Sequence, residues 1–547
     1  MNAHSLGRTR YHSAMEKFFN TAGPNQPDIH YTLLPMHRVN WPELSSLIGA
    51  RKYFILHAPR QTGKTSLLIN LMHFLNAQGQ YRALYVNIEA AQAARNNAVA
   101  ATTSMMQAME SAADFYWPDF PAAVQAARDQ LLITASGEGV RRLLQTWSRL
   151  SDKPLIIFFD EVDALVGDTL ISLLRQIRAG YAQRPEAFPQ SMILCGVRDV
   201  RDYRIHRSDG EIITGGSAFN IKSESIRLSD FTQTDVKALL QQHTDATGQT
   251  FEPGVLEEIW ADTQGQPWLV NALAYEACFR QQEQRDRNKS VTVEQMRQAR
   301  ESLIQRRDTH LDQLTDKLKE DRVRRVILPL LQNEGDVASL HPDDVQYVDD
   351  LGLIHVERQG QVTIANRIYQ EIIPRELTWG HQMGINQSQA WYVMQNGRMD
   401  IDKLLTAFQN FFRENAEVWL QCYDYKEAGP HLLLQAFLQR IVNGGGRIAR
   451  EYGLGRGRTD LFLQWPLTPD GFTGPMQQVV LELKIQHKGK ATTLATGLEQ
   501  TARYADQCGA DSAHLLIFNR DPDVAWDEKI YQEKHSSGDR AITVWGL

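Results

Sequence analysis

The sequence has 547 residues, 42% of them hydrophobic and 22% charged, and its formal net charge is −7. A chain of this length cannot bury its apolar residues in one core, so we expect three or four globular domains. The negative net charge excludes attraction of the whole molecule to nucleic acid, and any such contact must come from local basic patches.

No apolar run approaches the ~18 residues that span a bilayer, and the first residues of the sequence lack the apolar core of a signal peptide. The four cysteines are far apart and form no CxxC pair, which is typical of reduced thiols in a cytosolic protein. We therefore expect a soluble, cytoplasmic protein with no membrane partner.

The first predicted elements surround a phosphate loop. Residues 53–56 form a β-branched and aromatic run, and helical periodicity follows from Leu67, so the sequence predicts strand, loop and helix in the required order. The loop fits G-x-x-x-x-G-K-[ST], except that Ala58 replaces the first glycine. Backbone N–H groups at the helix N-terminus would hold the phosphates, with Lys64 on the β- and γ-phosphates and the Thr65 hydroxyl on Mg²⁺. The predicted nucleotide-binding residues here are Ala58, Pro59, Arg60, Gln61, Thr62, Gly63, Lys64, Thr65 and Ser66.

A second motif makes a chance match to the loop pattern a weak alternative. The apolar run in KPLIIFFDEVDAL ends in Asp160 and Glu161. In P-loop ATPases an acid at this strand end holds Mg²⁺, and an adjacent glutamate orients the attacking water. We therefore assign Asp160 to the metal and Glu161 to catalysis. Further apolar runs in RALYVNIEA and SMILCGVRDV complete an α/β plan with a mostly parallel sheet.

The segments YFILHAPRQTGKTS, FFDEVDAL and ILCGVRDVRDY resemble AAA-like ATPases close to the STAND class of signal-transduction NTPases. The resemblance covers residues 28–378 and implies ATP as cofactor. It also implies that Arg198, at the end of the sensor strand, contacts the γ-phosphate; a surface salt bridge is the alternative. TQGQPWLVNAL is similar to the glycine-x-proline motif of the helical lid, carried by Gly265 and Pro267, and Pro267 joins the predicted nucleotide-binding residues.

The middle of the chain predicts a helical lid and then two helices followed by two strands, the order of a winged helix, which similar ATPases carry at this place. The winged helix either contacts DNA through Arg322, Arg324 and Arg325 or, as we favour, serves packing and switching. The predicted domains are an N-terminal arm (1–27), the ATPase core (28–228), the lid (229–305), the winged helix (306–378), a linker (379–400) and a last domain (401–547).

The last domain centres on the stretch QVVLELKIQHK. Its alternation predicts an amphipathic strand with Val480, Glu482 and Lys484 on one face. Upstream, TDLFLQW alternates as a second strand that begins near Asp460, and the turn PLTPDGFTGP joins the two strands as a hairpin. A half-buried surface strand with an incidental Glu/Lys pair is the alternative to a site built from these residues.

Asp, followed after a hairpin by Glu-x-Lys, resembles the PD-(D/E)XK nucleases. The resemblance implies hydrolysis of phosphodiester bonds with Mg²⁺, for which Mn²⁺ can substitute, held by Asp460 and Glu482. It implies that Lys484 orients the attacking water or stabilises developing negative charge, and that Glu427 is the family's extra acid on a preceding helix.

A further helix supports the same family. In GLEQTARYAD, Gln500 and Tyr504 lie four residues apart on one predicted helix face. This pattern is similar to the Q-x-x-x-Y element of RecB-like nucleases, so both residues join the catalytic set. Arg456 and Arg458 precede Asp460 and would neutralise substrate phosphates.

These expectations combine into an ATP-regulated, Mg²⁺-dependent nuclease that acts on nucleic acid, DNA in particular. Fusion of a switch to a nuclease suggests defence against phage or mobile DNA, and the ATPase domain offers a route to a homo-oligomer. Two alternatives stay open. One is a non-catalytic, ATP-dependent switch that binds nucleic acid or a protein partner, and the other is a DNA-repair motor that translocates and trims.

Overall fold

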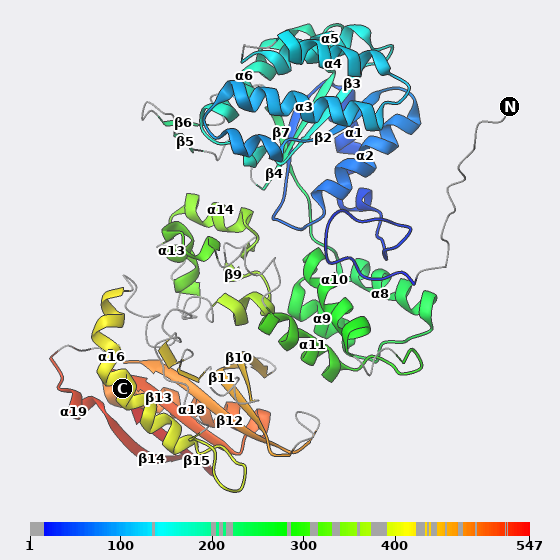
Figure 1. Ribbon diagram of the computed structural model, residues 1–547. Helices are drawn as coiled ribbons and strands as arrows, with labels where there is room; N and C mark the ends of the chain where they lie inside the picture. Colours follow the sequence, from blue (N-terminus) through cyan, green and yellow to red (C-terminus); the bar gives the residue numbers. More distant parts are fainter. Residues whose placement is uncertain are drawn as a thin grey trace. The chain divides into compact units, whose positions relative to one another are not determined.

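The computed structural model (Figure 1) divides into two compact units, which we describe separately. The first unit runs to Arg306 and includes Gln346–Ile354, and the second contains Arg307–Val345 and His355–Leu547. The structure describes residues 16–133, 137–197, 204–206, 212–214, 222–281, 286–306, 316–330, 340–357, 361–373, 391–422, 433–434, 437–438, 446–454, 457–468, 474–486, 489–519, 521 and 523–547.

The first unit is built on a parallel sheet of five strands in the order β2-β3-β4-β1-β7. The middle strands are almost wholly apolar and buried, as parallel strands covered on both faces must be. The α/β prediction with a parallel sheet is confirmed. The strands are β1 (Tyr53–His57), β2 (Arg82–Asn87), β3 (Leu155–Asp160), β4 (Ser191–Gly196) and β7 (Lys222–Arg227).

Helices cover both faces of this sheet (Figure 1). One apolar core lies between the sheet and α1 (Trp41–Gly49) and α2 (Lys64–Gln78). The core on the other face is packed by a second group of helices. That group consists of α3 (Ala98–Tyr116), α4 (Pro121–Ile133), α5 (Gly139–Leu150) and α6 (Asp168–Gly180). A small two-stranded sheet is formed by β5 (Arg204–His206) and β6 (Ile212–Thr214).

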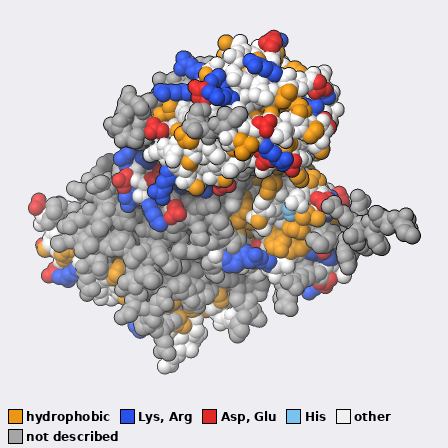
Figure 2. All heavy atoms as spheres, turned by 45° about the horizontal axis from the view of Figure 1, so that its top comes forward, with side chains coloured by type: hydrophobic (Ala, Val, Ile, Leu, Met, Phe, Trp, Pro, Cys, Tyr) orange, Lys and Arg blue, Asp and Glu red, His pale blue; other side chains and the backbone are white. Residues whose placement is uncertain are grey.

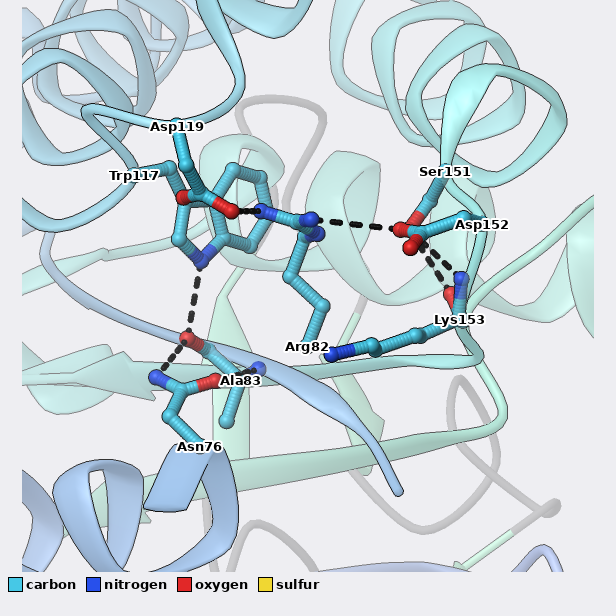
Figure 3. Close-up of polar contacts among 8 residues, drawn as sticks. All are labelled: Asn76, Arg82, Ala83, Trp117, Asp119, Ser151, Asp152 and Lys153. Carbon is cyan, nitrogen blue, oxygen red and sulfur yellow. Dashed lines mark hydrogen bonds and ion pairs between the residues drawn. The ribbon is translucent and has the colours of Figure 1, made fainter. Parts of the chain in front are cut away.

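One arginine at the start of β2 contacts the segments that follow α3 and α5 (Figure 3). The Arg82 guanidinium pairs with Asp119 at 2.9 Å and with Asp152 at 3.1 Å, and it lies over the Phe120 ring at 4.7 Å. Beside it, Trp117 Nε1 donates a hydrogen bond of 3.0 Å to the carbonyl oxygen of Ala83. These contacts fix the sheet edge at the end of β2 away from the phosphate loop.

The lid is helical, as the sequence predicts, and its core includes side chains from the N-terminal segment. Phe19 and Tyr31, at 0% and 2% exposure, pack into the lid core. Trp268 Nε1 donates to the carbonyl oxygen of Thr21 at 2.9 Å. The part of the predicted arm from residue 16 onward is therefore packed against the lid. The lid helices are α8 (Gln233–Thr247), α9 (Val255–Thr263), α10 (Pro267–Tyr275), a π-helix (Glu276–Arg280) and α11 (Val293–Arg306).

Among the described residues after the lid, helices at Asp321–Leu330 and Pro342–Asp350 precede a two-stranded sheet, which is the order predicted for a winged helix. The basic patch on the first of them pairs with acids nearby: Arg322 and Arg325 contact Asp344 at 3.4 and 2.9 Å, and Arg324 pairs with Asp321. Such pairing agrees with the structural role that we favour for these arginines. The elements are α13 (Asp321–Leu330), α14 (Pro342–Asp350), β8 (Ile354–Val356) and β9 (Val362–Ile364).

The second unit ends in a mixed sheet of six strands in the order β10-β11-β12-β13-β15-β14. The predicted hairpin is present as antiparallel β11 and β12, and β13 runs parallel to β12 after the crossover helix α18. The sequence pattern does not predict β10, which pairs with β11. The strands are β10 (Arg447–Leu454), β11 (Gly457–Pro466), β12 (Met476–Ile485), β13 (Ser512–Phe518), β14 (Tyr531–Ser537) and β15 (Arg540–Gly546).

Helices lie on both faces of the second sheet as well. α18 (Lys490–Cys508) packs on the face that carries Val480 and Leu515. α16 (Ile401–Cys422) contacts the other face, where Phe412 lies 5.3 Å from Phe518 between ring centroids. A short helix, α19 (Trp526–Lys529), precedes β14. Among the described residues, no helix combines the length and hydropathy of a membrane span.

β12 is buried on both faces, which corrects the prediction of an amphipathic strand. All residues from Val479 to Leu483 are at most 3% exposed, Glu482 included. The physical reason is α18, which covers the face that the alternation left polar. Residues 391–400, within the predicted linker, also contact this domain: Met399 N donates to Gln477 Oε1 at 2.7 Å, and Trp465 Nε1 donates to the carbonyl oxygen of Gly397.

Candidate nucleotide site and candidate nuclease site

The phosphate loop joins β1 to α2 and is shaped by two residues with positive φ. Gly63, at φ 88°, is the N-cap of α2, and Gln61 has φ 57°. The loop therefore turns so that the first free N–H groups of α2 face one side, where a phosphate can accept them. Lys64 is 6% exposed, and its ammonium donates to the carbonyl oxygens of Ala58 and Pro59, at 3.0 Å each.

Asp160 lies beside the loop at the end of β3 and is fully buried. The Thr65 hydroxyl donates to Asp160 Oδ2 at 2.7 Å, and the Tyr85 hydroxyl donates to the same oxygen at 3.0 Å. The backbone N–H of Glu161 donates to Oδ1 at 3.0 Å. The structure brings the two predicted magnesium ligands, Thr65 and Asp160, together. Tyr85 was not predicted, because its partner is 75 residues away along the chain.

Glu161, the predicted catalytic acid, follows Asp160 in the left-handed conformation, at φ 59° and ψ 41°. Burial raises the pKa of its carboxyl group, and the charges of Asp163 and Asp160 raise it further. A strained backbone and a raised pKa are both typical of a carboxylate that acts as a base. Such a pKa suits proton abstraction from water.

A cavity of about 300 Å³ lies beside the phosphate loop and Glu161. The phosphate loop and Glu161 form one wall, the lid forms another, and the N-terminal segment forms a third. The sequence analysis did not predict this third wall. Asn271, on α10, lines the cavity, and its buried Oδ1 has no hydrogen-bond partner among the described residues. The lining residues outside the phosphate loop include 20–25, Tyr31, Arg38, Phe231, Pro267, Trp268 and Asn271.

The residues present fit a nucleotide with its magnesium ion. Thr65 and Asp160 offer the hard oxygen donors that Mg²⁺ prefers, and the positive φ of Gly63 gives the loop the turn that a phosphate cradle needs. Asn271 Oδ1 offers an unused acceptor in the same cavity. Arg198, the predicted contact of the γ-phosphate, lies outside the described residues.

A further segment of the first unit lies against the phosphate loop. A Cβ added to Gly352, which has φ +75°, would be 2.6 Å from Pro59 Cγ. Close by in sequence, Asp349 pairs with Arg227 at the end of β7. The turn that follows α14 thus packs directly on the predicted nucleotide-binding loop.

With the fold and the site in place, a comparison with known families identifies the class of the phosphate-loop region of the first unit. Residues 54–184 match the family described as ATPase family associated with various cellular activities (AAA). This part of the chain is therefore an AAA-family P-loop ATPase domain. No curated protein matches the sequence.

Several solved structures are similar to the chain at low identity. A Walker-type ATPase of Pyrococcus abyssi is 14% identical, with a TM-score of 0.45, over 65% of this chain and 99% of that one. The ORC2 protein of Aeropyrum pernix, in ADPNP and ADP complexes, is 14% identical (TM-score 0.38; 64% and 96% covered). RuvB of Thermotoga maritima, a Holliday junction branch migration motor, is 12% identical (TM-score 0.31; 61% and 93% covered).

The candidate nuclease site lies where β11 and β12 pair. Leu461 is aligned with Leu481, so Asp460 and Glu482 each lie one residue from this pair on adjacent strands. Glu482 is 3% exposed, and Lys484 Nζ lies 3.1 Å from Glu482 Oε1. Only the backbone of Asp460 is described, and Glu427 lies outside the described residues.

Gln500 and Tyr504 are on α18, as predicted, and this helix covers the face of β12 that carries Glu482. Tyr504 is 7% exposed in the apolar cluster that includes Val480. Gln500 Oε1 is buried, with no hydrogen-bond partner among the described residues. Among described side chains, no group of three His, Cys, Asp or Glu residues is close enough to hold a metal.

Proposed function

We propose that the chain is an ATP-regulated, Mg²⁺-dependent nuclease. In this proposal the AAA-family domain changes state with its nucleotide, and the sheet of the second unit cuts nucleic acid, DNA in particular. The observation that carries the nuclease half is the buried Glu482 paired with the half-buried Lys484 on β12, beside the strand of Asp460 and beneath α18.

A buried carboxylate is a poor choice for stability alone, because its loss of hydration offsets the attraction to the half-buried Lys484. Apolar residues of similar volume would fit β12 at least as well, and the other residues from Val479 to Leu483 are apolar. The charges on this strand therefore support a role in chemistry. The unused acceptor of Gln500 on the covering helix supports the same reading.

At both sites a bound Mg²⁺ supplies a Lewis acid that polarises a phosphoryl oxygen and lowers the pKa of water. At the ATPase site Thr65 and Asp160 would hold the ion. Lys64 would exchange the loop carbonyls of Ala58 and Pro59 for phosphate oxygens, and Glu161 would take the proton of the attacking water. At the nuclease site Glu482 and Asp460 would hold the ion, and Lys484 would orient water.

The proposal is tested by cleavage of plasmid and linear DNA with Mg²⁺ or Mn²⁺, in the presence and absence of ATP. We expect Glu482→Ala to reduce cleavage on the order of 100-fold or more, because it removes a metal ligand. Glu499→Ala, which removes an exposed carboxylate from α18, should cut as well as wild type. Lys64→Ala should lose the response to ATP. Intact DNA under every condition, or an active Glu482→Ala variant, contradicts the nuclease.

One observation favours a second candidate, a non-catalytic switch that binds nucleic acid. Lys484 Nζ lies 3.1 Å from Glu482 Oε1, so the lysine can neutralise this carboxylate itself, and the fold can serve recognition alone. Calorimetric titration with Mn²⁺ separates the two candidates. Binding that disappears in Glu482→Ala supports the nuclease, and no binding to wild type supports the switch.

A further inference from the structure

One half-buried arginine links the phosphate loop to the start of the lid. Arg38 ends a short 3-10 helix (Pro35–Arg38) and lines the nucleotide cavity. Its Nη1 donates to the carbonyl oxygen of Thr62 at 2.5 Å. Its Nε donates to the carbonyl oxygen of Ser229 at 2.8 Å, and Nη2 donates to the same oxygen. In return, the Ser229 hydroxyl donates to the carbonyl oxygen of Arg38 at 3.2 Å.

On the loop side, Arg38 holds a peptide group that phosphate binding needs. The Thr62 carbonyl and the Gly63 N–H belong to one planar trans peptide, so they point in opposite directions. A guanidinium that holds the carbonyl therefore directs the Gly63 N–H away from itself. The approach is close: a Cβ on Gly63 would lie 3.2 Å from Arg38 Nη1.

On the lid side, Arg38 contacts the segment between β7 and α8. The guanidinium lies 5.0 Å from the ring centroid of Phe231, a cation–π contact. Phe231 N donates to the carbonyl oxygen of Gly265 at 2.9 Å. α10 begins two residues later and places Asn271 in the cavity wall. Contacts thus run without a break from the phosphate loop through Arg38 to α10.

Burial lowers the pKa of Arg38 to about 10, and Asp230 and Asp235 oppose this change. The guanidinium therefore keeps its charge at neutral pH. A charged donor makes stronger hydrogen bonds than a neutral one, which favours a contact that holds two backbone segments at once. Lysine keeps the charge but cannot reach two carbonyls with a planar fork.

We propose that Arg38 is a positioning residue that couples nucleotide binding at the phosphate loop to closure of the lid. This inference rests on the proposed nucleotide site. Arg38 holds the Thr62–Gly63 peptide in the orientation that phosphate binding needs. Because the same guanidinium binds the carbonyl oxygen of Ser229, where the chain enters the lid, ordering of the loop also orders the start of the lid. The nucleotide then orders the lid wall of its cavity as well as the phosphate-loop wall.

The test is hydrogen–deuterium exchange with and without saturating Mg²⁺ and a non-hydrolysable ATP analogue, together with nucleotide affinity. In wild type we expect protection of the phosphate loop and of α8 and α10. In Arg38→Lys we expect the dissociation constant to rise roughly ten-fold, the size of one charged hydrogen bond. At saturation the loop should then be protected and the lid helices should not. Arg38→Gln should behave in the same way.

Arg82→Lys is the matched control, because Arg82 also bridges two segments and stacks on an aromatic ring, far from the loop (Figure 3). It should keep wild-type affinity within two-fold and keep protection of both the phosphate loop and the lid helices α8 and α10. Full lid protection in saturated Arg38→Lys overturns the coupling and leaves direct phosphate contact as the role of Arg38. Unchanged affinity in that variant overturns it as well. Absence of protection anywhere in wild type overturns the nucleotide site itself and this inference with it.

Discussion

At the scale of single residues, the nucleotide site depends on how a buried carboxylate is satisfied. Taking an ion out of water costs several kcal/mol unless hydrogen bonds replace the lost hydration. Asp160, which is 0% exposed, receives three such bonds, from Thr65, Tyr85 and the N–H of Glu161. Tyr85 is aligned with Phe158 in the parallel pair β2–β3, so its side chain lies on the face of Asp160. Burial and the nearby carboxylate raise the pKa of Tyr85, which keeps its proton available.

The first residue-scale prediction concerns this hydroxyl. Tyr85→Phe should raise the Mg²⁺ concentration for half-maximal ATP hydrolysis about ten-fold, because a group that orients a metal ligand is lost. Binding of nucleotide in EDTA should not change. Tyr116→Phe removes a hydroxyl from the tyrosine whose ring contacts Tyr85 edge-on at 6.4 Å and should behave as wild type. Equal Mn²⁺ affinity of wild type and Tyr85→Phe, measured by electron paramagnetic resonance with ADP present, would refute this role.

At the scale of elements, the lid is held by a close approach between two loops. Gly265 joins α9 to α10 at φ +80°, and a Cβ there would lie 2.0 Å from the Phe231 carbonyl oxygen. That oxygen belongs to backbone, so it cannot move aside as a flexible side chain does. The glycine of the predicted glycine-x-proline motif is therefore required by packing between α10 and the start of α8.

We expect Gly265→Ala to destabilise the lid by about 3 kcal/mol or more, the sum of left-handed strain and a backbone clash. Gly248→Ala isolates the first of these costs. Gly248 ends α8 at φ +79°, and an added Cβ there meets nothing within 4 Å, so only about 1 kcal/mol should be lost. Urea unfolding of the three proteins measures the difference. Equal losses in the two variants would show that the contact with Phe231 does not matter.

At the scale of the whole molecule, the net charge is −7. On the described surface that faces the viewer in Figure 2, Lys and Arg side chains lie among Asp and Glu side chains. Stability also depends on buried groups that titrate. His514 is 3% exposed in β13, where it accepts a hydrogen bond of 3.1 Å from Trp545 Nε1.

Burial lowers the pKa of His514 from 6.5 to about 4, so the folded protein keeps it neutral where the unfolded chain protonates it. Between these values the unfolded state binds more protons, and stability falls as the pH falls. From pH 7 to pH 5 the free energy of unfolding of the second unit should drop by about 2 kcal/mol through this residue. His514→Gln should lack this part of the loss in urea titrations at the two pH values. The same pH dependence in both proteins would contradict the assignment.

The sequence anticipated the features that are local in the chain. The phosphate loop and its helix, the acid at the end of β3, the lid helices and the β11–β12 hairpin are all encoded in short runs of periodicity and turn residues. It missed β10, the third wall of the nucleotide cavity, Tyr85 and Arg38. Each of these depends on a partner far away in sequence, and periodicity carries no information about such partners.

The sequence by itself determined the AAA-type phosphate loop with its acid, and it determined the order of a strand with a carboxylate, a hairpin turn and a Glu-x-Lys strand. Only the tertiary structure decided how far these groups are buried and which segments surround them. Glu482 is buried because α18 crosses its face of the sheet, and the nucleotide cavity has three walls because residues 20–38 return to the loop and the lid. Burial and hydrogen bonding arise from packing between distant segments, and they set what a carboxylate or a guanidinium can do.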